Sequence, residues 1–268
     1  MQAPLLSPDD APEVYATAAS GKENGEPMTD AERDFERAWQ AKLARAVEAE
    51  AGGPARAEVM AGSERLSSNS PAAEVIRWSR GAVERLTARI GPERTADVLS
   101  CCACRYPEAA LEDVRRTYER TGEVGDAQRI LQERFETFLR DGLKLDEGKI
   151  QEIVRRGWGP AGVREGGRII ATKIPKSGSL AAYLEEGDAA KRRKMYCHCP
   201  RVRAAVDGGE EFPAAYCACG AGYYRGIWET ILRRPVRVEL LESVLGGGAA
   251  CRVAIHLPAD ISGDHGAE

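Results

Sequence analysis

The sequence predicts an α+β fold, in which a helical N-terminal half is followed by a mixed part that ends in an antiparallel hairpin. Up to residue 157, apolar residues recur every three or four positions between prolines and glycines that punctuate helices. After residue 167 the period changes, and short segments alternate apolar with polar residues. No stretch approaches the roughly 18 consecutive apolar residues of a membrane span, so we expect a protein with no membrane partner.

The first 70 residues are predicted to be a disordered region with one amphipathic helix at 29–51. Before the helix, the chain is rich in Ala, Pro, Glu and Gly and shows no period. Thr29 and Glu32 have the spacing of a capping box. An apolar residue then recurs every fourth position, at Phe35, Trp39, Leu43 and Val47. The segment 52–70 has the composition of a weakly ordered linker.

A cysteine-rich α+β domain is predicted over residues 71–258, with its helical part at 71–157. Pro71 suits the first turn of a helix, Pro107 disfavours helix just before it, and Gly122 suits a helix C-terminus. These signals predict helices at 71–90, 91–107, 108–122, 126–142 and 146–157.

The mixed part of this domain is predicted over residues 167–258. Strands are expected at 167–175, 235–245 and 251–258, a short helix within 177–188, and a longer helix at 221–234. The last two strands flank Gly246, Gly247 and Gly248 and would form the closing hairpin. The glycine-rich stretch 157–167 suggests an interdomain loop, and residues 259–268 a disordered tail.

The composition is that of a soluble globular protein. The chain has 268 residues, 43% hydrophobic content and a formal charge of −4, so it lacks the basic balance of a nucleic-acid-binding protein. The N-terminus has neither the basic nor the apolar region of a secretory signal. We therefore expect a cytoplasmic protein with reduced thiols, in which clustered cysteines favour metal binding or catalysis over disulfides. The oligomeric state stays open.

Seven of the eight cysteines fall in three tight groups, at 101–104, 197–199 and 217–219. The exception, Cys251, shares one face of a predicted strand with Val253 and Ile255, which suggests a core position.

The two Cys-x-Cys motifs predict a metal centre formed by Cys197, Cys199, Cys217 and Cys219. In an extended segment, residues i and i+2 point to the same face with Cα atoms about 6.6 Å apart. Two such pairs facing each other would supply four thiolates to zinc or another soft metal ion. Structural zinc sites more often use Cys-x₂₋₄-Cys, so the alternatives of a reactive thiol site and of simple packing remain open.

A cysteine-dependent enzyme, hydrolytic or redox, is the first alternative. Cys219 directly precedes a predicted helix, whose N-terminus would favour a thiolate nucleophile. A disulfide within a Cys-x-Cys pair would be strained and easily reduced. Cys102 is the second candidate for the nucleophile.

The group "SCCACRYP" (100–107) could border the same site. On a helix, Cys101 and Cys104 share a face, and Cys102 lies about 100° around the axis. These three cysteines and His198 are therefore candidate ligand-binding residues, and tight helix packing is the alternative. The basic run at 191–194 suggests a solvated loop that could also favour a thiolate at Cys197.

Three segments, "YCHCPRV", "YCACGAGYYRGIWETIL" and "PVRVELLESVLGGGAACRVAIHLP", resemble a bacterial family of cysteine-rich proteins of unassigned function. The resemblance implies an α+β fold with a site built around the clustered cysteines. The closing hairpin is also similar to the end of 4-vinyl-reductase-type domains, which implies a small-molecule ligand. The late Gly…Cys strand is similar to that of L-2-amino-thiazoline-4-carboxylate hydrolase-like proteins, which implies a thiol hydrolase.

Three hypotheses follow from these patterns: a thiolate protein that binds a soft metal ion or a small ligand, a cysteine enzyme, and an interaction module in which the thiols only pack.

Overall fold

The computed structural model describes residues 34–197 and 199–262. The expectations for residues 1–33, including the capping box of Thr29, and for His198 and residues 263–268 lie outside the described residues. The chain divides into two compact units, which are described separately. Of the described residues, unit 1 comprises 34–103, Cys197 and 199–219, and unit 2 comprises Cys104–Tyr196 and 220–262.

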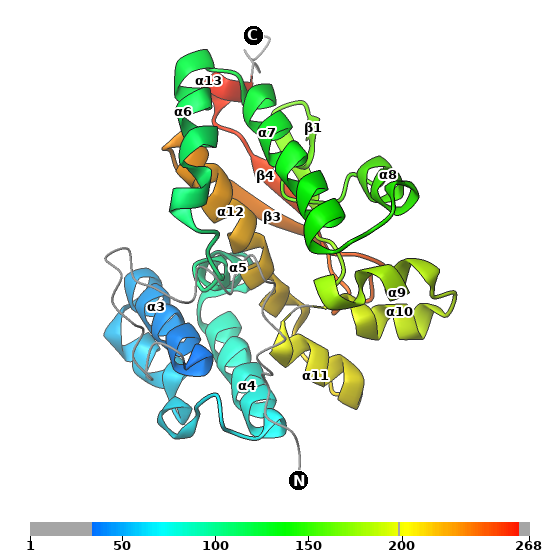
Figure 1. Cartoon of the computed structure of the whole chain (residues 1–268). Coiled ribbons are helices and arrows are strands. Elements are labelled where there is room, and N and C mark those ends of the chain that lie inside the picture. The colour runs from blue at the N-terminus through cyan, green and yellow to red at the C-terminus, as the bar shows by residue number, and fades with distance from the viewer. Residues whose placement is uncertain (1–33, 198, 263–268) are drawn as a thin grey trace. The chain divides into compact units, whose positions relative to one another are not determined.

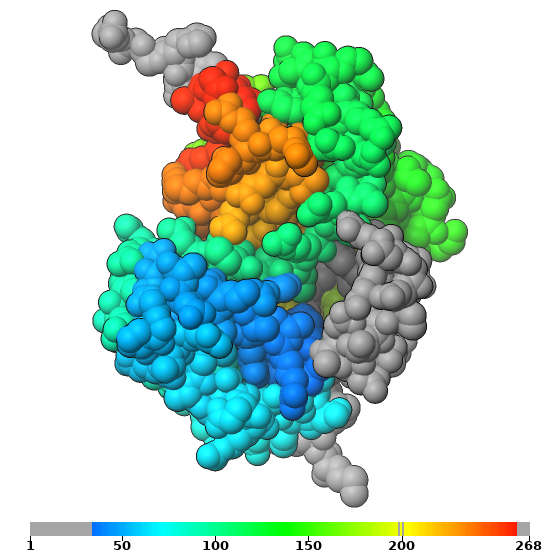
Figure 2. Space-filling view, turned by 90° about the vertical axis from the view of Figure 1, so that its left-hand side faces the viewer, coloured from blue at the N-terminus to red at the C-terminus, as the bar shows by residue number. Residues whose placement is uncertain are grey.

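Unit 1 is built from helices. Helix α4 packs against α3, α5 and α11, and the short helix η6 packs on α5. Figure 1 shows α11 beside α4, although the two helices are far apart in the sequence, and Figure 2 shows α3 and α4 forming much of one face of the unit. The elements are α3 (Phe35–Met60), η2 (Ser63–Arg65), α4 (Ala72–Ile90), α5 (Pro92–Ser100), α11 (Pro200–Gly208), η6 (Ala214–Cys217) and the first two residues of α12 (Ala218–Leu232).

Helix α3 is longer than predicted, because it continues to Met60 through part of the expected linker. Gly52 has a positive φ of 83°, which kinks the chain, and Pro54 then lies in the first turn of a second helical segment. Ala55 and Val59 of that segment are buried, four residues apart. The predicted boundary at residue 70 therefore does not separate the units, since α3 and α4 belong to the same one.

Helix α5 is shorter than predicted and ends at Ser100. The N–H groups of Cys101 and Cys102 donate to the carbonyl oxygens of Val98 and Leu99, at 3.1 and 2.9 Å. These i→i−3 bonds close the last turn, after which the chain leaves the helix. The expectation that Cys101 and Cys104 share a helical face is therefore wrong.

Unit 2 places helices against a four-stranded sheet with the order β1-β2-β4-β3, in which every pairing is antiparallel. Apolar residues of α6, α7 and α12 share one core with one face of this sheet. The elements are η3 (Glu108–Leu111), α6 (Glu112–Thr121), α7 (Val124–Thr137), the π-helical turn η4 (Phe138–Gly142), α8 (Glu147–Arg155), β1 (Val163–Glu165), β2 (Arg168–Thr172), η5 (Ser177–Ser179), α9 (Leu180–Glu185), α10 (Ala189–Tyr196), the rest of α12, β3 (Arg237–Glu242), β4 (Arg252–His256) and α13 (Ala259–Ser262).

The predicted α+β class is confirmed, and so is the closing hairpin, in which Val238 pairs with Ile255 and Leu240 with Val253. Three local predictions are wrong. The stretch 157–167 contains β1 inside unit 2 and is not an interdomain loop, the basic run 191–194 lies on α10, and residues 259–262 form α13. Of the helices in the described ranges, none has both the length and the apolar character needed to cross a bilayer.

Candidate thiol site

Six of the eight cysteines belong to unit 1, and we call them the thiol site: Cys101, Cys102, Cys197, Cys199, Cys217 and Cys219. The fold thus brings both Cys-x-Cys motifs and most of the first group into one unit. Cys104 and Cys251 belong to unit 2. All eight cysteines are among the described residues, and no disulfide links them.

The first Cys-x-Cys motif lies at the start of α11. Cys199 is the N-cap residue and has an extended backbone, with φ −67° and ψ 119°. Its carbonyl oxygen accepts the first hydrogen bond of the helix, from the Arg203 N–H at 2.9 Å. The thiol of buried Cys197 points to the same carbonyl oxygen, at 3.9 Å. The half-buried Cys199 is therefore placed at the N-terminus of α11.

The second motif is helical, which corrects the expectation of an extended pair. Cys217 ends η6, and Cys219 is the second residue of α12. Because consecutive helical residues are about 100° apart, the two side chains point in widely different directions. The turn begins at Pro213, whose carbonyl oxygen accepts from the Tyr216 N–H at 3.0 Å. Cys219 does lie in the first turn of a helix, as predicted, and it is half-buried.

Cys101 and Cys102 are neighbours with different surroundings. Cys101 is exposed, whereas Cys102 is 1% exposed and points its thiol at the Val98 carbonyl oxygen, 3.5 Å away. Burial, together with negative charge at Cys219 and Cys101, raises the pKa of Cys102. The positive charges of Lys42 and Arg201 oppose this shift without cancelling it. A thiol that stays protonated at neutral pH is a poor nucleophile, so the structure disfavours Cys102 in that role.

A buried arginine connects the two motifs. Arg201, in the first turn of α11, is 1% exposed, and its Nη1 donates to the Tyr216 hydroxyl at 3.2 Å. Its Nη2 pairs with the carboxylate of Glu36 on α3, which is 3% exposed. The guanidinium carbon lies 4.3 Å from the centroid of the Trp39 ring. We call Glu36, Trp39, Arg201 and Tyr216 the arginine cluster.

The thiol site and the arginine cluster are close enough to influence each other's charge. Burial would lower the pKa of Arg201, but electrostatic interactions with Tyr216, Glu36 and Cys199 and the hydrogen bond to Glu36 outweigh burial and raise it. Burial raises the pKa of Tyr216 well above its usual range, and Cys199 and Cys219 raise it further while Arg201 opposes them. Thiols from both motifs therefore lie within electrostatic range of a single tyrosine.

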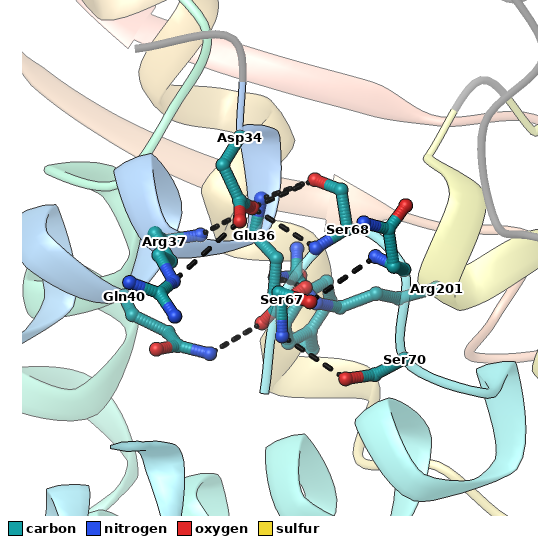
Figure 3. Close-up of polar contacts among 10 residues, drawn as sticks. Asp34, Glu36, Arg37, Gln40, Ser67, Ser68, Ser70 and Arg201 are labelled. Carbon is teal, nitrogen blue, oxygen red and sulfur yellow. Dashed lines mark hydrogen bonds and ion pairs between the residues drawn. The ribbon is translucent and has the colours of Figure 1, made fainter. Parts of the chain in front are cut away.

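The start of α3 fixes the position of Glu36 (Figure 3). Asp34 caps the helix by accepting from the Arg37 N–H at 3.1 Å, and it also accepts from the N–H and hydroxyl of Ser68, at 3.0 and 2.7 Å. The Ser68 hydroxyl oxygen accepts from the Glu36 N–H at 3.3 Å, and the Gln40 amide donates to the Glu36 carboxylate at 3.0 Å. Burial would raise the pKa of Asp34, but the bonds from Ser68 and the backbone lower it.

The sequence interpretation missed the arginine cluster. Its one local signal is that Glu36 and Gln40 occur within the apolar stripe of Trp39 and Leu43, where buried polar groups need partners. Nothing near Arg201 in the sequence indicates that its partner lies on α3.

The predicted four-thiolate centre is not assembled as a ligand set. Within 34–197 and 199–262, which leave out His198, no three His, Cys, Asp or Glu side chains are grouped so that they could hold a metal ion. Part of this difference has a geometric reason: the second motif is helical, so its two thiols do not present one common face.

Comparisons with known proteins found no match: no protein-family model, no curated protein and no solved structure matches the chain. The resemblance to a cysteine-rich bacterial family and the likeness to 4-vinyl-reductase-type domains therefore stay predictions.

Proposed function

We propose that unit 1 binds a soft metal ion, with zinc as the first candidate, through thiolates of its two Cys-x-Cys motifs. One observation carries the proposal: the fold places both motifs in one unit, with Cys199 at the start of α11 and Cys219 in the first turn of α12, and a hydrogen bond from Arg201 to Tyr216 joins the two segments. Cysteine thiolates are the preferred ligands of soft metal ions.

Metal binding at this site would include a rearrangement of the thiols. Because no ligand set is formed among the described residues, the metal ion would have to draw Cys197, Cys199, Cys217 and Cys219 together. Coupling of metal binding to local ordering is common in small thiolate sites. The imidazole of His198, between Cys197 and Cys199 in the sequence, offers a nitrogen ligand from the same segment.

The experiment is a zinc titration of the reduced, metal-free protein against a chromophoric chelator, followed by elemental analysis. We expect about one zinc ion per chain, as for a single tetrahedral site. Cys199→Ser and Cys219→Ser should each weaken binding about tenfold or more. Cys104→Ser and Cys251→Ser, at thiols of unit 2, are the matched controls and should bind like the wild type. Absence of zinc from the wild-type protein, or equal affinity in all four variants, would reject the proposal.

A cysteine enzyme with Cys219 as the nucleophile is the second candidate function. The half-buried position of Cys219 in the first turn of a 15-residue helix favours it. Iodoacetamide labelling followed by peptide mass spectrometry at pH 7 tests this idea. Faster alkylation of Cys219 than of exposed Cys104 would support it, and slower alkylation would remove it.

A further inference from the structure

We propose that Arg201 is the positioning residue of the thiol site: by bridging Glu36 and Tyr216, it holds the segment that carries Cys199 and the segment that carries Cys219 in one arrangement. The purpose of this clamp rests on the proposed function, but its existence can be tested without any metal ion.

Arg201 and Tyr216 each lie close to one of the two cysteines in the sequence. Arg201 comes two residues after Cys199, and Tyr216 comes three residues before Cys219. The bond from Arg201 Nη1 to the Tyr216 hydroxyl, at 3.2 Å, therefore joins the two segments close to their thiols. A shift of either segment would change this bond.

The chemistry of the arginine suits its partners. Its guanidinium uses separate nitrogens for Tyr216 and for Glu36, and its planar face lies over Trp39. A lysine ammonium has neither the planar fork nor the flat face, so it could not reproduce this arrangement.

The ion pair of Arg201 and Glu36 is buried. Arg201 and Glu36 are almost completely buried, and the desolvation of two charges offsets most of the energy that they gain from pairing. Apolar residues of similar volume could fill the same space with equal or greater stability. What the ion pair adds is a defined geometry between three segments of unit 1.

Glu36, to which Arg201 is paired, is itself held by two hydrogen bonds. Glu36 accepts from Gln40 one turn along α3, and its N–H donates to Ser68. The Trp39 ring packs on Tyr216 with a centroid distance of 5.5 Å and also lies under Arg201. Helix α3 therefore contacts both the segment of Cys199 and the segment of Cys219.

The experiment measures whether Cys199 and Cys219 are held together. In a Cys197→Ser/Cys217→Ser background, each segment keeps one thiol. Dibromobimane becomes fluorescent when both of its arms react, and peptide mass spectrometry identifies the cross-linked pair. We expect a Cys199–Cys219 cross-link in this background, and a rate about tenfold lower after Arg201→Met or Tyr216→Phe, because the thiols lose their mutual orientation. Arg201→Lys should not restore the rate.

Arg89→Met is the matched control, since Arg89 pairs with Glu58 on the exposed surface of the same unit. It should cross-link like the background. Because Arg201→Met leaves Glu36 buried without its charge partner, the double variant Glu36→Gln/Arg201→Met keeps the test valid if the single variant unfolds. Circular dichroism identifies which variants are folded.

Three results would overturn the proposal: no Cys199–Cys219 cross-link in the background, an unchanged rate in folded variants that lack the clamp, or restoration of the rate by Arg201→Lys. The zinc titration of the wild-type protein is scored separately. A wild-type protein that binds no zinc, but whose cross-link depends on Arg201, would reject the proposed function and retain the clamp. Zinc binding together with a cross-link that does not depend on Arg201 would retain the proposed function and reject the clamp.

Discussion

Cys101 and Cys102 show how strongly burial separates two identical side chains. They are adjacent on the turn that follows α5, yet Cys101 is exposed and Cys102 is buried with its pKa raised. Because the thiolate is the reactive form, a reagent should reach and modify exposed Cys101 more readily than buried Cys102.

We therefore predict that iodoacetamide alkylates Cys101 at least about tenfold faster than Cys102 at pH 8. Peptide mass spectrometry of a time course measures both rates in one sample, so that each thiol serves as the control for the other. In urea, where both side chains are exposed, the rates should become similar. Equal rates in the native protein would contradict the burial of Cys102.

At the scale of one element, α3 combines a cap, a kink and an anchor for the arginine cluster. Asp34 satisfies N–H groups at its start, and Gly52 interrupts it with a backbone conformation that side chains disfavour. Both features are local, so each can be tested with one substitution and one control substitution.

For the cap, we predict that Asp34→Ala destabilises the protein by about 1 kcal/mol at pH 7. The pKa of Asp34 is lowered below 3.8 in the folded state, so its contribution is complete above that pH and is lost as the pH falls through the folded-state pKa. We therefore expect the free energy of unfolding of Asp34→Ala, measured in urea, to lie closer to that of the wild type near pH 3 than at pH 7. Asp97→Ala, at an exposed position of α5, is the control and should change stability by less than about 0.5 kcal/mol. A difference independent of pH would contradict the role of the Asp34 charge.

For the kink, we predict that Gly52→Ala costs on the order of 1–3 kcal/mol, because its φ of 83° and ψ of 172° are strained for any residue with a side chain. Gly53→Ala is the matched control. Its φ is ordinary and no atom lies within 4 Å of the added Cβ, so its effect should stay within about 1 kcal/mol. Thermal unfolding of the two variants measures the difference, and equal losses would show that the kink is not specific to Gly52.

At the scale of the whole molecule, each unit is formed by two separate stretches of the chain. Unit 1 takes in Cys197–Cys219, a segment that the chain enters from unit 2 and leaves toward unit 2. The segment is therefore grouped with residues 34–103 and not with its neighbours in the sequence.

We predict that Leu43→Ala, at a buried position of α3, destabilises unit 1 by about 2–5 kcal/mol. Hydrogen exchange should then rise in residues 34–103 and, together with them, in 199–219. Ile255→Ala, at a buried position of β4, is the counterpart and should raise exchange mainly in 104–196 and 220–262. If 199–219 followed Ile255→Ala and not Leu43→Ala, the division into units would be wrong.

The sequence by itself determined the α+β class, the helices around Leu43 and Leu86, and the hairpin of β3 and β4. These features depend on apolar period, caps and turn residues, all of which act over a few positions. Only the tertiary structure decided that the second Cys-x-Cys motif is helical, that α3 continues beyond Gly52, and that Arg201 pairs with Glu36 across 165 positions. The physical reason is that a local pattern specifies backbone conformation and the buried face, whereas the partner of a buried charge is specified by packing between distant segments.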